Sequence, residues 1–252
     1  MYDIEATVVQ NKNIVSGYYL LKMHLLKHIG KIQPGQFVMI RIPGNEVFLR
    51  RPFSIYEGNK DTISIMYRVV GKGTEILSKV KKNIQTSILG PLGNGFHLND
   101  TDNYHVVAGG IGIAGVNMLI KRLGKRASVF FGCNSKDELQ LIKDIKGSDV
   151  KIATLDGSEG YKGNVVDLLE NYLISTKTEM VETLVCGPKG MYEGLRGLFE
   201  KTGTPCQVLV EERMACGFGL CFGCVIRTTD DKEPYKRICK EGPVFDLWKI
   251  SL

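Results

Sequence analysis

Hydrophobic and polar positions follow one pattern up to about residue 100 and a different one beyond it. In the first part, short stretches rich in β-branched and aromatic residues are separated by glycine, proline and asparagine, which predicts β-strands joined by turns. We expect strands at residues 7–10, 18–25, 37–42 and 62–70. Turn signals lie at residues 11–13, 33–35, 43–45 and 57–59. One short helix is expected at 73–80, and many short strands at regular spacing favour a small closed antiparallel barrel.

From about residue 102 the pattern predicts strands that alternate with helices, which implies a parallel sheet. The expected strands are residues 104–108, 128–133, 151–154 and 183–186. The expected helices are residues 113–123, 135–145, 165–171 and 191–202. From about residue 206 the chain is rich in cysteine and should be mostly loop. We therefore expect a multi-domain protein with an antiparallel β-barrel at 1–100, an α/β domain at 101–205 and a small domain at 206–252.

Composition excludes some classes of function. Of the 252 residues, 43% are hydrophobic and 24% charged, as in an ordinary globular protein, and the net charge is only +6. The basic runs lack the interleaved aromatic residues of a nucleic-acid surface, so no nucleic-acid partner is expected. The longest mostly apolar stretch, residues 106–116, is too short and too rich in glycine to span a membrane. With no signal peptide at the start, the sequence predicts a cytoplasmic protein.

Four of the seven cysteines are arranged as Cys-x4-Cys-x2-Cys-x14-Cys near the C-terminus. This spacing is typical of the ligands of a plant-type [2Fe–2S] cluster. The candidate metal ligands are Cys216, Cys221, Cys224 and Cys239. Glycines between the first three allow a tight loop whose N–H groups face the sulfur atoms. A cluster that passes single electrons needs a donor and an acceptor, which the rest of the chain or a partner must supply.

Other interpretations of these cysteines fit less well. A zinc site made of four cysteines usually has two short Cys-x2-Cys pairs, and here the last cysteine stands alone. Disulfides are disfavoured because the number of cysteines is odd and no signal peptide is present. Zinc and unliganded thiols stay open as alternatives to the iron–sulfur cluster.

A glycine-rich turn joins the first strand and helix of the α/β part. Gly110, Gly112 and Gly115 form Gly-x-Gly-x-x-Gly, where backbone N–H groups can approach a phosphate. The alternative role of these glycines is close packing of the helix on the strand. The acidic residue that binds ribose in the dinucleotide fingerprint is missing from residues 132–136, where it is expected. The choice between NAD and NADP therefore stays open.

A second group of residues is suited to a flavin. Arg51, Pro52, Phe53 and Ser54 resemble the Arg-x-aromatic-Ser/Thr signature of the ferredoxin–NADP reductase superfamily. An arginine fork can bind the FAD pyrophosphate, and a serine hydroxyl can hydrogen-bond the reactive flavin nitrogen. A surface ion pair and an ordinary loop are the alternative explanations. The resemblance also implies FAD contacts by Gly73 and Thr74 at the phosphates, and by Met66, Tyr67 and Arg68 near the adenosine.

The same superfamily has a Cys-Gly-Pro segment after the last strand of its nucleotide domain. Cys186 and Gly187 match it, which implies a site for NAD with the Cys186 thiol beside the nicotinamide ring. Burial alone is the other explanation of this cysteine. In the tail, residues 214–224 and 235–246 resemble the iron–sulfur subunit of the NAD-linked, class 1B dihydroorotate dehydrogenase, and the resemblance extends over nearly the whole chain.

The resemblance implies a function. A separate FMN-containing catalytic subunit would oxidise dihydroorotate in pyrimidine biosynthesis, and this subunit would pass the electrons through the cluster and FAD to NAD+. The implied assembly is a heterotetramer of two catalytic and two electron-transfer subunits. A catalytic TIM barrel takes about 250 residues by itself, so this chain has no room for one beside its other modules.

Other functions share these modules. A related FAD and [2Fe–2S] subunit of a ferredoxin:NADP or sulfide-linked oxidoreductase is the nearest alternative. A stand-alone reductase for an oxygenase and a non-catalytic redox-sensing module are further ones. Phe218, Leu220 and Phe222, within the cysteine loop, could form a docking surface for the partner, or could shield the cluster from water.

Overall fold

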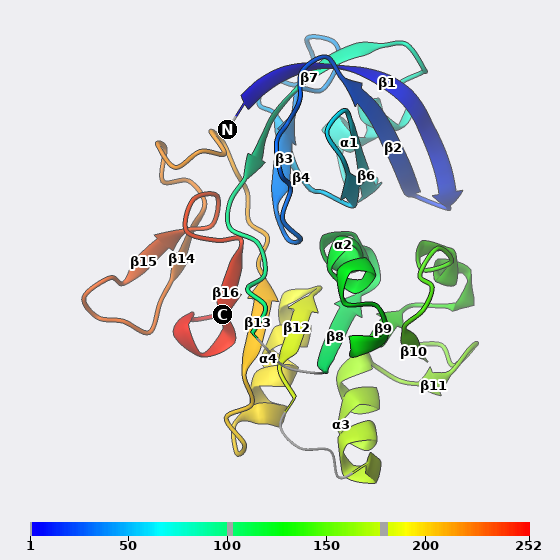
Figure 1. Ribbon diagram of the computed structural model, residues 1–252, viewed down its shortest axis with the longest axis vertical. Coiled ribbons are helices and arrows are strands. Elements are labelled where there is room, and N and C mark those ends of the chain that lie inside the picture. Colours follow the sequence, from blue (N-terminus) through cyan, green and yellow to red (C-terminus); the bar gives the residue numbers. More distant parts are fainter. Residues whose placement is uncertain (1, 100–102, 177–180) are drawn as a thin grey trace.

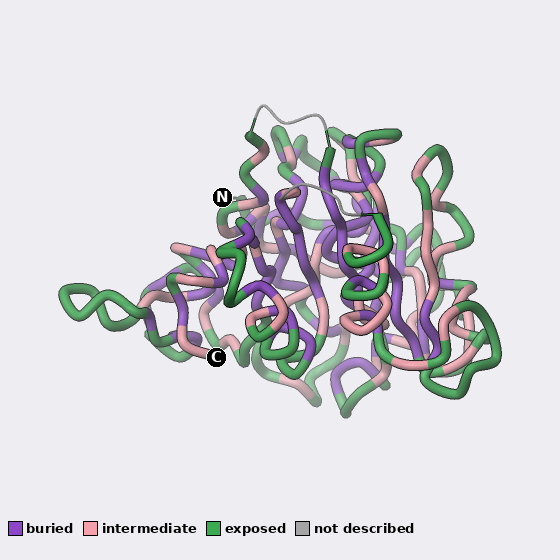
Figure 2. The backbone as a smooth tube through the Cα atoms, turned by 90° about the horizontal axis from the view of Figure 1, so that it is seen from below, coloured by how far each residue is buried: buried purple, intermediate pink, exposed green. Residues whose placement is uncertain are grey.

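The computed structural model describes residues 2–99, 103–176 and 181–252. Two sheets lie one above the other in Figure 1, and the C-terminal segment forms a small unit at their side. Figure 2 shows that buried residues follow the strands through the middle of the molecule, whereas exposed residues predominate in the connecting loops. None of the helices in these residue ranges is both long and apolar enough to cross a membrane.

The N-terminal sheet is antiparallel and has the strand order β4-β3-β7-β1-β2-β6-β5. Its strands are β1 (Tyr2–Val15), β2 (Tyr18–Leu25), β3 (Phe37–Ile40), β4 (Arg51–Ser54), β5 (Glu57–Gly58), β6 (Thr62–Arg68) and β7 (Gln85–Leu92). It curls into a half-barrel around a core that includes Leu21, Ile65 and Ile88. The antiparallel architecture is thus as expected, and closure into a complete barrel stays a prediction.

Two predicted turns in this sheet differ from the structure. Residues 57 and 58 of the turn expected at 57–59 form β5, and the turn to β6 begins at Asn59. The turn expected at 11–13 is wrong altogether. Residues 11–13 lie inside β1, which continues to Val15 and pairs with β2 along most of its length. The polar Asn11 is used for capping. Its Nδ2 donates to the carbonyl oxygens of Leu77 at 2.8 Å and Val80 at 3.2 Å, at the end of helix α1 (Lys72–Ser78). Asparagine is common in turns, so the sequence around Asn11 indicates a turn. In the structure, its side chain instead donates hydrogen bonds to the free carbonyl oxygens at a helix end.

The second sheet has the strand order β11-β10-β9-β8-β12-β13-β16 and is parallel except for β16. Its strands are β8 (Tyr104–Gly109), β9 (Ala127–Cys133), β10 (Asp149–Thr154), β11 (Tyr161–Lys162), β12 (Thr183–Cys186), β13 (Cys206–Leu209) and β16 (Val244–Asp246). Helix α2 (Ile113–Leu123) packs on the face toward the half-barrel, and helices α3 (Val165–Thr176) and α4 (Lys189–Phe199) cover the opposite face. The parallel sheet was expected.

The helix expected at residues 135–145 is wrong in type. Its centre is a 3-10 helix, η3 (Lys136–Leu141), and i→i+3 hydrogen bonds join Ile142 to Leu139 and Ile145 to Ile142. A 3-10 helix has three residues per turn, so Leu139, Ile142 and Ile145 come onto one face. All three pack against the core between the sheet and α2. This three-residue repeat of apolar side chains favours the tighter helix over the α-helix.

The C-terminal segment is more regular than expected. Besides β13 and β16, it has the hairpin β14 (Val225–Arg227) and β15 (Tyr235–Arg237) and the 3-10 helix η4 (Leu247–Lys249). Strand β13 pairs with β12, and β16 pairs with β13, so both extend the parallel sheet. The three domain boundaries stay predictions.

Candidate functional site

A cavity of about 940 Å³ lies between the half-barrel and the segment that follows β13. We call it the flavin cavity. All nine residues that the sequence marks for FAD line it: Arg51, Pro52, Phe53, Ser54, Met66, Tyr67, Arg68, Gly73 and Thr74. They come from β4, β6 and the start of α1, so three separate elements converge on one hollow.

Arg51 and the first turn of α1 form one end of this cavity. The Nη1 of Arg51 donates to the carbonyl oxygen of Leu49 at 2.7 Å. A Cβ on Gly73 would lie 3.2 Å from the Nε of Arg51, so glycine lets the guanidinium approach the helix closely. Among the described residues no carboxylate forms an ion pair with Arg51. An arginine fork beside the free N–H groups of a helix start fits a diphosphate.

Two side chains in the cavity wall have structural roles as well. The hydroxyl of Thr74 accepts hydrogen bonds from the backbone N–H groups of Val70 at 2.9 Å and Gly71 at 3.1 Å, so it shapes the turn before α1. The hydroxyl of Tyr67 donates to Oδ1 of Asn11 at 3.2 Å, and burial raises the pKa of Tyr67. These hydrogen bonds stiffen the wall of the cavity.

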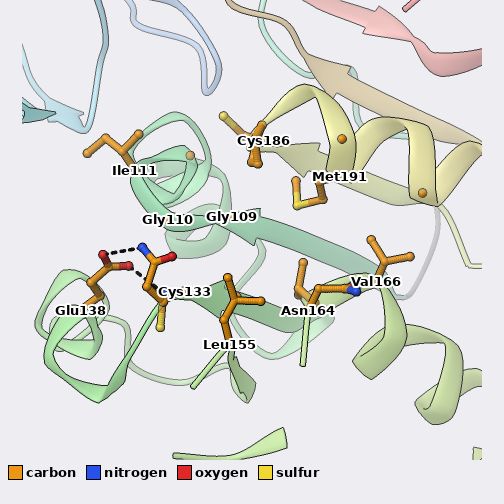
Figure 3. A pocket seen from close by; sticks show the side chains of 18 of the residues that line it. Gly109, Gly110, Ile111, Cys133, Glu138, Leu155, Asn164, Val166, Cys186 and Met191 are labelled. Carbon is orange, nitrogen blue, oxygen red and sulfur yellow. Dashed lines mark hydrogen bonds between the residues drawn. The ribbon is translucent and has the colours of Figure 1, made fainter. Parts of the chain in front are cut away.

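A second cavity, of about 680 Å³, lies at the carboxyl ends of β8, β9, β10 and β12. We call it the nicotinamide cavity, and Figure 3 shows it from close by. Gly110, Gly112, Cys186 and Gly187, the four residues marked for NAD, all line it. Ligands of open parallel sheets bind outside the carboxyl ends of the strands, which is the position of this cavity.

The glycines of the turn between β8 and α2 have different roles. A Cβ on Gly112 would lie 2.2 Å from the carbonyl oxygen of Cys186, and one on Gly115 would lie 2.9 Å from its Sγ. Both glycines therefore permit close packing against β12. In contrast, a Cβ on Gly110 would meet no described heavy atom within 4 Å, and its φ is +51°. Gly110 is thus the glycine of this turn with open space before it.

Cys186 is buried at the end of β12, where burial raises the pKa of its thiol well above the usual value. The thiol is therefore neutral at ordinary pH. The hydroxyl of Tyr192 donates to the carbonyl oxygen of Leu209 at 2.6 Å and accepts from the N–H of Gly187 at 3.0 Å. This buried hydroxyl ties the ends of β12 and β13 together, and so holds the Cys186–Gly187 corner in place.

Glu138 is a cavity residue that the sequence analysis missed. Its carboxylate accepts hydrogen bonds from the backbone N–H of Asn134 at 3.1 Å and from the Asn134 side chain at 2.9 Å, drawn as dashed lines in Figure 3. The hydroxyl of Tyr18 approaches it at 3.3 Å. The acidic residue of the dinucleotide fingerprint is expected at residues 132–136, and the 3-10 helix η3 instead turns Glu138 back to the end of β9. The exposed Leu155 lies nearby in the same cavity.

The two cavities are adjoining. Arg68, Ile111 and Glu211 line both of them. Glu211 follows the end of β13. A ligand in either cavity therefore meets the same three side chains, and two ligands bound together would approach each other there.

The four cysteines of the tail come together as two pairs. The N–H of Cys221 points at Sγ of Cys216 at 3.5 Å. Burial, and next the neighbouring Cys224 thiol, raise the pKa of the Cys239 thiol. The Cys216 pKa falls to about 6, because N–H groups including those of Cys221 and Phe218 outweigh the opposing effect of burial. No described set of three or more His, Cys, Asp or Glu side chains is grouped as for a metal ion. Two thiolates for each of two irons is the ligand arrangement of a [2Fe–2S] cluster, and the pairs match it.

The backbone of this loop is specialised. Gly217, Gly219 and Phe222 have φ values of 78°, 89° and 54°, in the left-handed region. The turn at Phe222 brings the N–H of Gly223 to 3.4 Å from Sγ of Cys221. N–H groups directed at sulfur favour the thiolate form that a metal needs.

The cysteine loop lies directly beside the flavin cavity. Met214 lines that cavity, and Cys216 follows two residues later, a reach of about 7 Å at most. A Cβ on Gly217 would lie 2.5 Å from Cγ of Met39 on β3, the strand that pairs with β4. On its outer side the loop exposes apolar side chains, with Leu220 75% and Phe222 61% accessible. The loop thus has one side on the half-barrel and another in solvent.

Comparison with known proteins agrees with this geometry. The family model "Iron-sulfur cluster binding domain of dihydroorotate dehydrogenase B" matches residues 211–251. The dihydroorotate dehydrogenase B (NAD(+)) electron transfer subunit of Caldanaerobacter subterraneus is 36% identical over 97% of this chain and 96% of its own length. The chain belongs to this family. The corresponding subunit of Clostridium acetobutylicum is 37% identical over 97% of this chain and 95% of its own.

Solved structures show the fold of this family member independently. The structure of an NADH-dependent reduced ferredoxin-NADP oxidoreductase matches with a TM-score of 0.86 and 24% identity, over 98% of this chain and 89% of that one. A ferredoxin NADP+ reductase from Neisseria gonorrhoeae matches with a TM-score of 0.67 and 16% identity, over 81% of this chain and 92% of that one. The expected reductase-like fold is therefore confirmed.

Proposed function

We propose that this chain is the electron-transfer subunit of an NAD-dependent dihydroorotate dehydrogenase. It receives electrons from a catalytic subunit and delivers them through a [2Fe–2S] cluster and FAD to NAD+. The observation that carries the proposal is the order of the sites: the cysteine loop adjoins the flavin cavity, and the flavin cavity shares Arg68, Ile111 and Glu211 with the nicotinamide cavity. Bound FAD supplies the exchange between single electrons and a hydride that such a chain of sites requires.

The residues of the flavin cavity have distinct tasks. Arg51 and the N–H groups of Gly73 and Thr74 hold the diphosphate of FAD, and Pro52 and Phe53 support the isoalloxazine ring. In this proposal the Ser54 hydroxyl, which lines the cavity, hydrogen-bonds a ring nitrogen of the flavin. The remaining wall, Met66, Tyr67 and Arg68, contacts the adenosine side of FAD.

In the nicotinamide cavity, the turn at Gly110 and Gly112 approaches the diphosphate of NAD. Cys186 and Gly187 lie against the nicotinamide, where a neutral thiol provides a close contact without adding charge. The thiol is buried, so its task is to position the ring and keep water away. Cys216, Cys221, Cys224 and Cys239 hold the cluster.

Glu138 supports NAD over NADP, which the sequence left open. Its carboxylate is fixed at the end of β9 by Asn134, where the ribose of a dinucleotide lies in related sheets. A negative charge there accepts a hydrogen bond from a 2′-hydroxyl and repels a 2′-phosphate. Glu138→Gln should lower the ratio of the rate of flavin reduction by NADH to the rate by NADPH. An unchanged ratio would contradict this role.

The partner in this proposal is an FMN-containing catalytic subunit, assembled as two catalytic and two electron-transfer subunits in the cytoplasm. The exposed apolar side of the cysteine loop is the proposed docking surface. The nearest alternative is a related FAD and [2Fe–2S] subunit of a ferredoxin:NADP or sulfide-linked oxidoreductase, because the same modules can serve several functions. We keep residues 1–100, 101–205 and 206–252 as the proposed FAD, NAD and cluster domains.

The test combines the purified chain with an FMN-containing dihydroorotate dehydrogenase subunit. Dihydroorotate-dependent reduction of NAD+ should appear only with both proteins present. The chain alone should contain FAD, iron and acid-labile sulfide and should oxidise NADH with an artificial acceptor. Cys221→Ala should abolish the coupled reaction while FAD stays bound. Ferredoxin-dependent NADP+ reduction without any response to dihydroorotate would instead favour the alternative.

A further inference from the structure

Arg237 joins the two parts of the chain that carry the cluster cysteines. It ends strand β15 and stands two residues before Cys239. Its Nη1 donates to the carbonyl oxygen of Gly219 at 2.8 Å, and its guanidinium carbon lies 4.7 Å from the centre of the Phe222 ring. Gly219 and Phe222 belong to the loop of the first three cysteines, and both have left-handed backbones. One side chain thus spans from the fourth cysteine's segment to the strained part of the loop.

Glu241 fixes the guanidinium in this position. Its carboxylate accepts from Nε of Arg237 at 3.1 Å and from Nη2 at 2.5 Å, and it also accepts from the Arg237 backbone N–H at 2.7 Å. The side chains of Arg237 and Glu241 are only 20% and 31% exposed. A two-point pair of this kind holds the arginine in one orientation, so its remaining nitrogen faces the cysteine loop.

The guanidinium places a positive charge close to the cluster cysteines. It belongs to the residue two positions before Cys239, and it contacts Gly219 and Phe222, which lie on either side of Cys221 in the chain. Reduction of an iron–sulfur cluster adds one electron and no proton is needed, so the cluster becomes more negative. A fixed positive charge nearby stabilises that reduced form, and a fixed negative charge opposes it.

We propose that Arg237 is a positioning residue of the cluster and sets its reduction potential. Its fork holds the three-cysteine loop against the segment of Cys239, its positive charge raises the potential, and Glu241 moderates that effect. The inference rests on the proposed function only in that the four cysteines bind a [2Fe–2S] cluster. It requires neither dihydroorotate nor a partner subunit.

The experiment is a redox titration of the anaerobically purified full chain, followed by electron paramagnetic resonance, with iron and sulfide analysis of each variant. Arg237→Gln should shift the cluster to a lower potential, and Glu241→Gln should shift it to a higher one. Arg237→Lys keeps the charge, so its potential should stay nearer the wild type although its cluster content falls. Lys236→Gln is the matched control: it removes the same charge from the adjacent residue, which pairs with Glu233 instead.

Shifts of opposite sign for Arg237→Gln and Glu241→Gln cannot come from a loosened loop, because loosening would move both variants in the same direction. The proposal would be overturned if the potentials of Arg237→Gln and Glu241→Gln shift in the same direction. It would also be overturned if neither shift is larger than that of Lys236→Gln. Should Arg237→Gln fail to retain iron, the sign of the Glu241→Gln shift decides alone. Absence of iron and sulfide from the wild type would be a different failure, that of the cluster itself and of the proposed function.

Discussion

At the scale of single residues, the charge and the shape of a side chain contribute separately to ligand affinity. Substitutions of Arg51 can distinguish these two contributions to FAD binding. The Arg51 guanidinium lies against Gly73, and its N–H donors lie in one plane as a fork. A lysine would supply the same charge from a single ammonium group. Arg51→Ala should weaken FAD binding by about 2 kcal/mol, roughly thirtyfold, as expected for a lost charge-assisted hydrogen bond. Arg51→Lys should recover only part of this loss.

Flavin fluorescence during titration of the FAD-free chain measures this affinity. Arg50→Lys is the control, because Arg50 pairs with Asp3 at 2.9 Å and does not line the flavin cavity. Equal FAD affinities for Arg51→Ala and the wild type would remove Arg51 from the site.

His105 shows a residue-scale effect on stability. It is buried on β8 with its ring edge-on to Phe130 and Tyr172, and burial, aided by Lys151, lowers its pKa to about 4. Below the ordinary histidine pKa of about 6.5, the unfolded chain takes up a proton that the folded chain refuses. Stability is therefore lost as the pH falls from about 6.5 to 4, by about 1.4 kcal/mol per pH unit.

His105→Phe keeps an aromatic ring and removes the titrating group. Urea unfolding at pH 7 and pH 5 should show the wild type losing about 2 kcal/mol more than the variant over this interval. Other titrating groups cancel in that difference because both proteins share them. The same loss in both would show that His105 is protonated in the folded state.

At the scale of elements, the two glycines of the turn between β8 and α2 differ in their surroundings: Gly112 packs against β12, and Gly110 has open space before it. A Cβ at position 112 collides with backbone at 2.2 Å, so Gly112→Ala should lower the melting temperature and disturb the Cys186 corner. Position 110 has open space and a left-handed φ that asparagine tolerates. Gly110→Asn should therefore keep its stability and its FAD, while NADH reduces the flavin more slowly.

Stopped-flow reduction of the flavin by NADH, together with thermal unfolding, distinguishes these two outcomes. If Gly110→Asn reacts at the wild-type rate at every NADH concentration, the diphosphate does not approach this turn.

The elements also show where reasoning from sequence succeeds. The sequence predicts strand β12 at residues 183–186 and helix α2 at 113–123, and the structure has both elements within these bounds. Each is marked by a regular pattern of apolar residues within its own segment. The turn at 11–13 and the helix at 135–145 were wrong, since their structures depend on α1 and on the core beneath α2, which are distant in sequence. Among site residues, the cysteine spacing and the arginine signature are local patterns. Glu138 and Glu211 reach their cavities only through tertiary folding, and no short motif marks them.

At the scale of the whole molecule, the sites form a continuous line from the nicotinamide cavity through the flavin cavity to the cysteine loop, and the outer side of that loop is apolar. Single-electron transfer falls off steeply with distance, so a donor protein must approach the loop itself. Leu220, 75% exposed at the tip, is the side chain that such a donor would cover first. Exposure of the leucine side chain to water is unfavourable in free energy, and docking of a partner would bury that apolar surface.

Leu220→Asp should therefore abolish dihydroorotate-driven NAD+ reduction by the assembled complex, because a buried carboxylate without a partner is costly at an interface. NADH oxidation with a small artificial acceptor should continue at the wild-type rate, since that reaction needs only this chain. Ile174→Asp is the matched control, because Ile174 is 70% exposed near the end of α3, away from the cysteine loop. This substitution should leave both reactions intact. If Leu220→Asp strips the iron yet the two subunits still co-purify, the loop shields the cluster and the docking surface lies elsewhere.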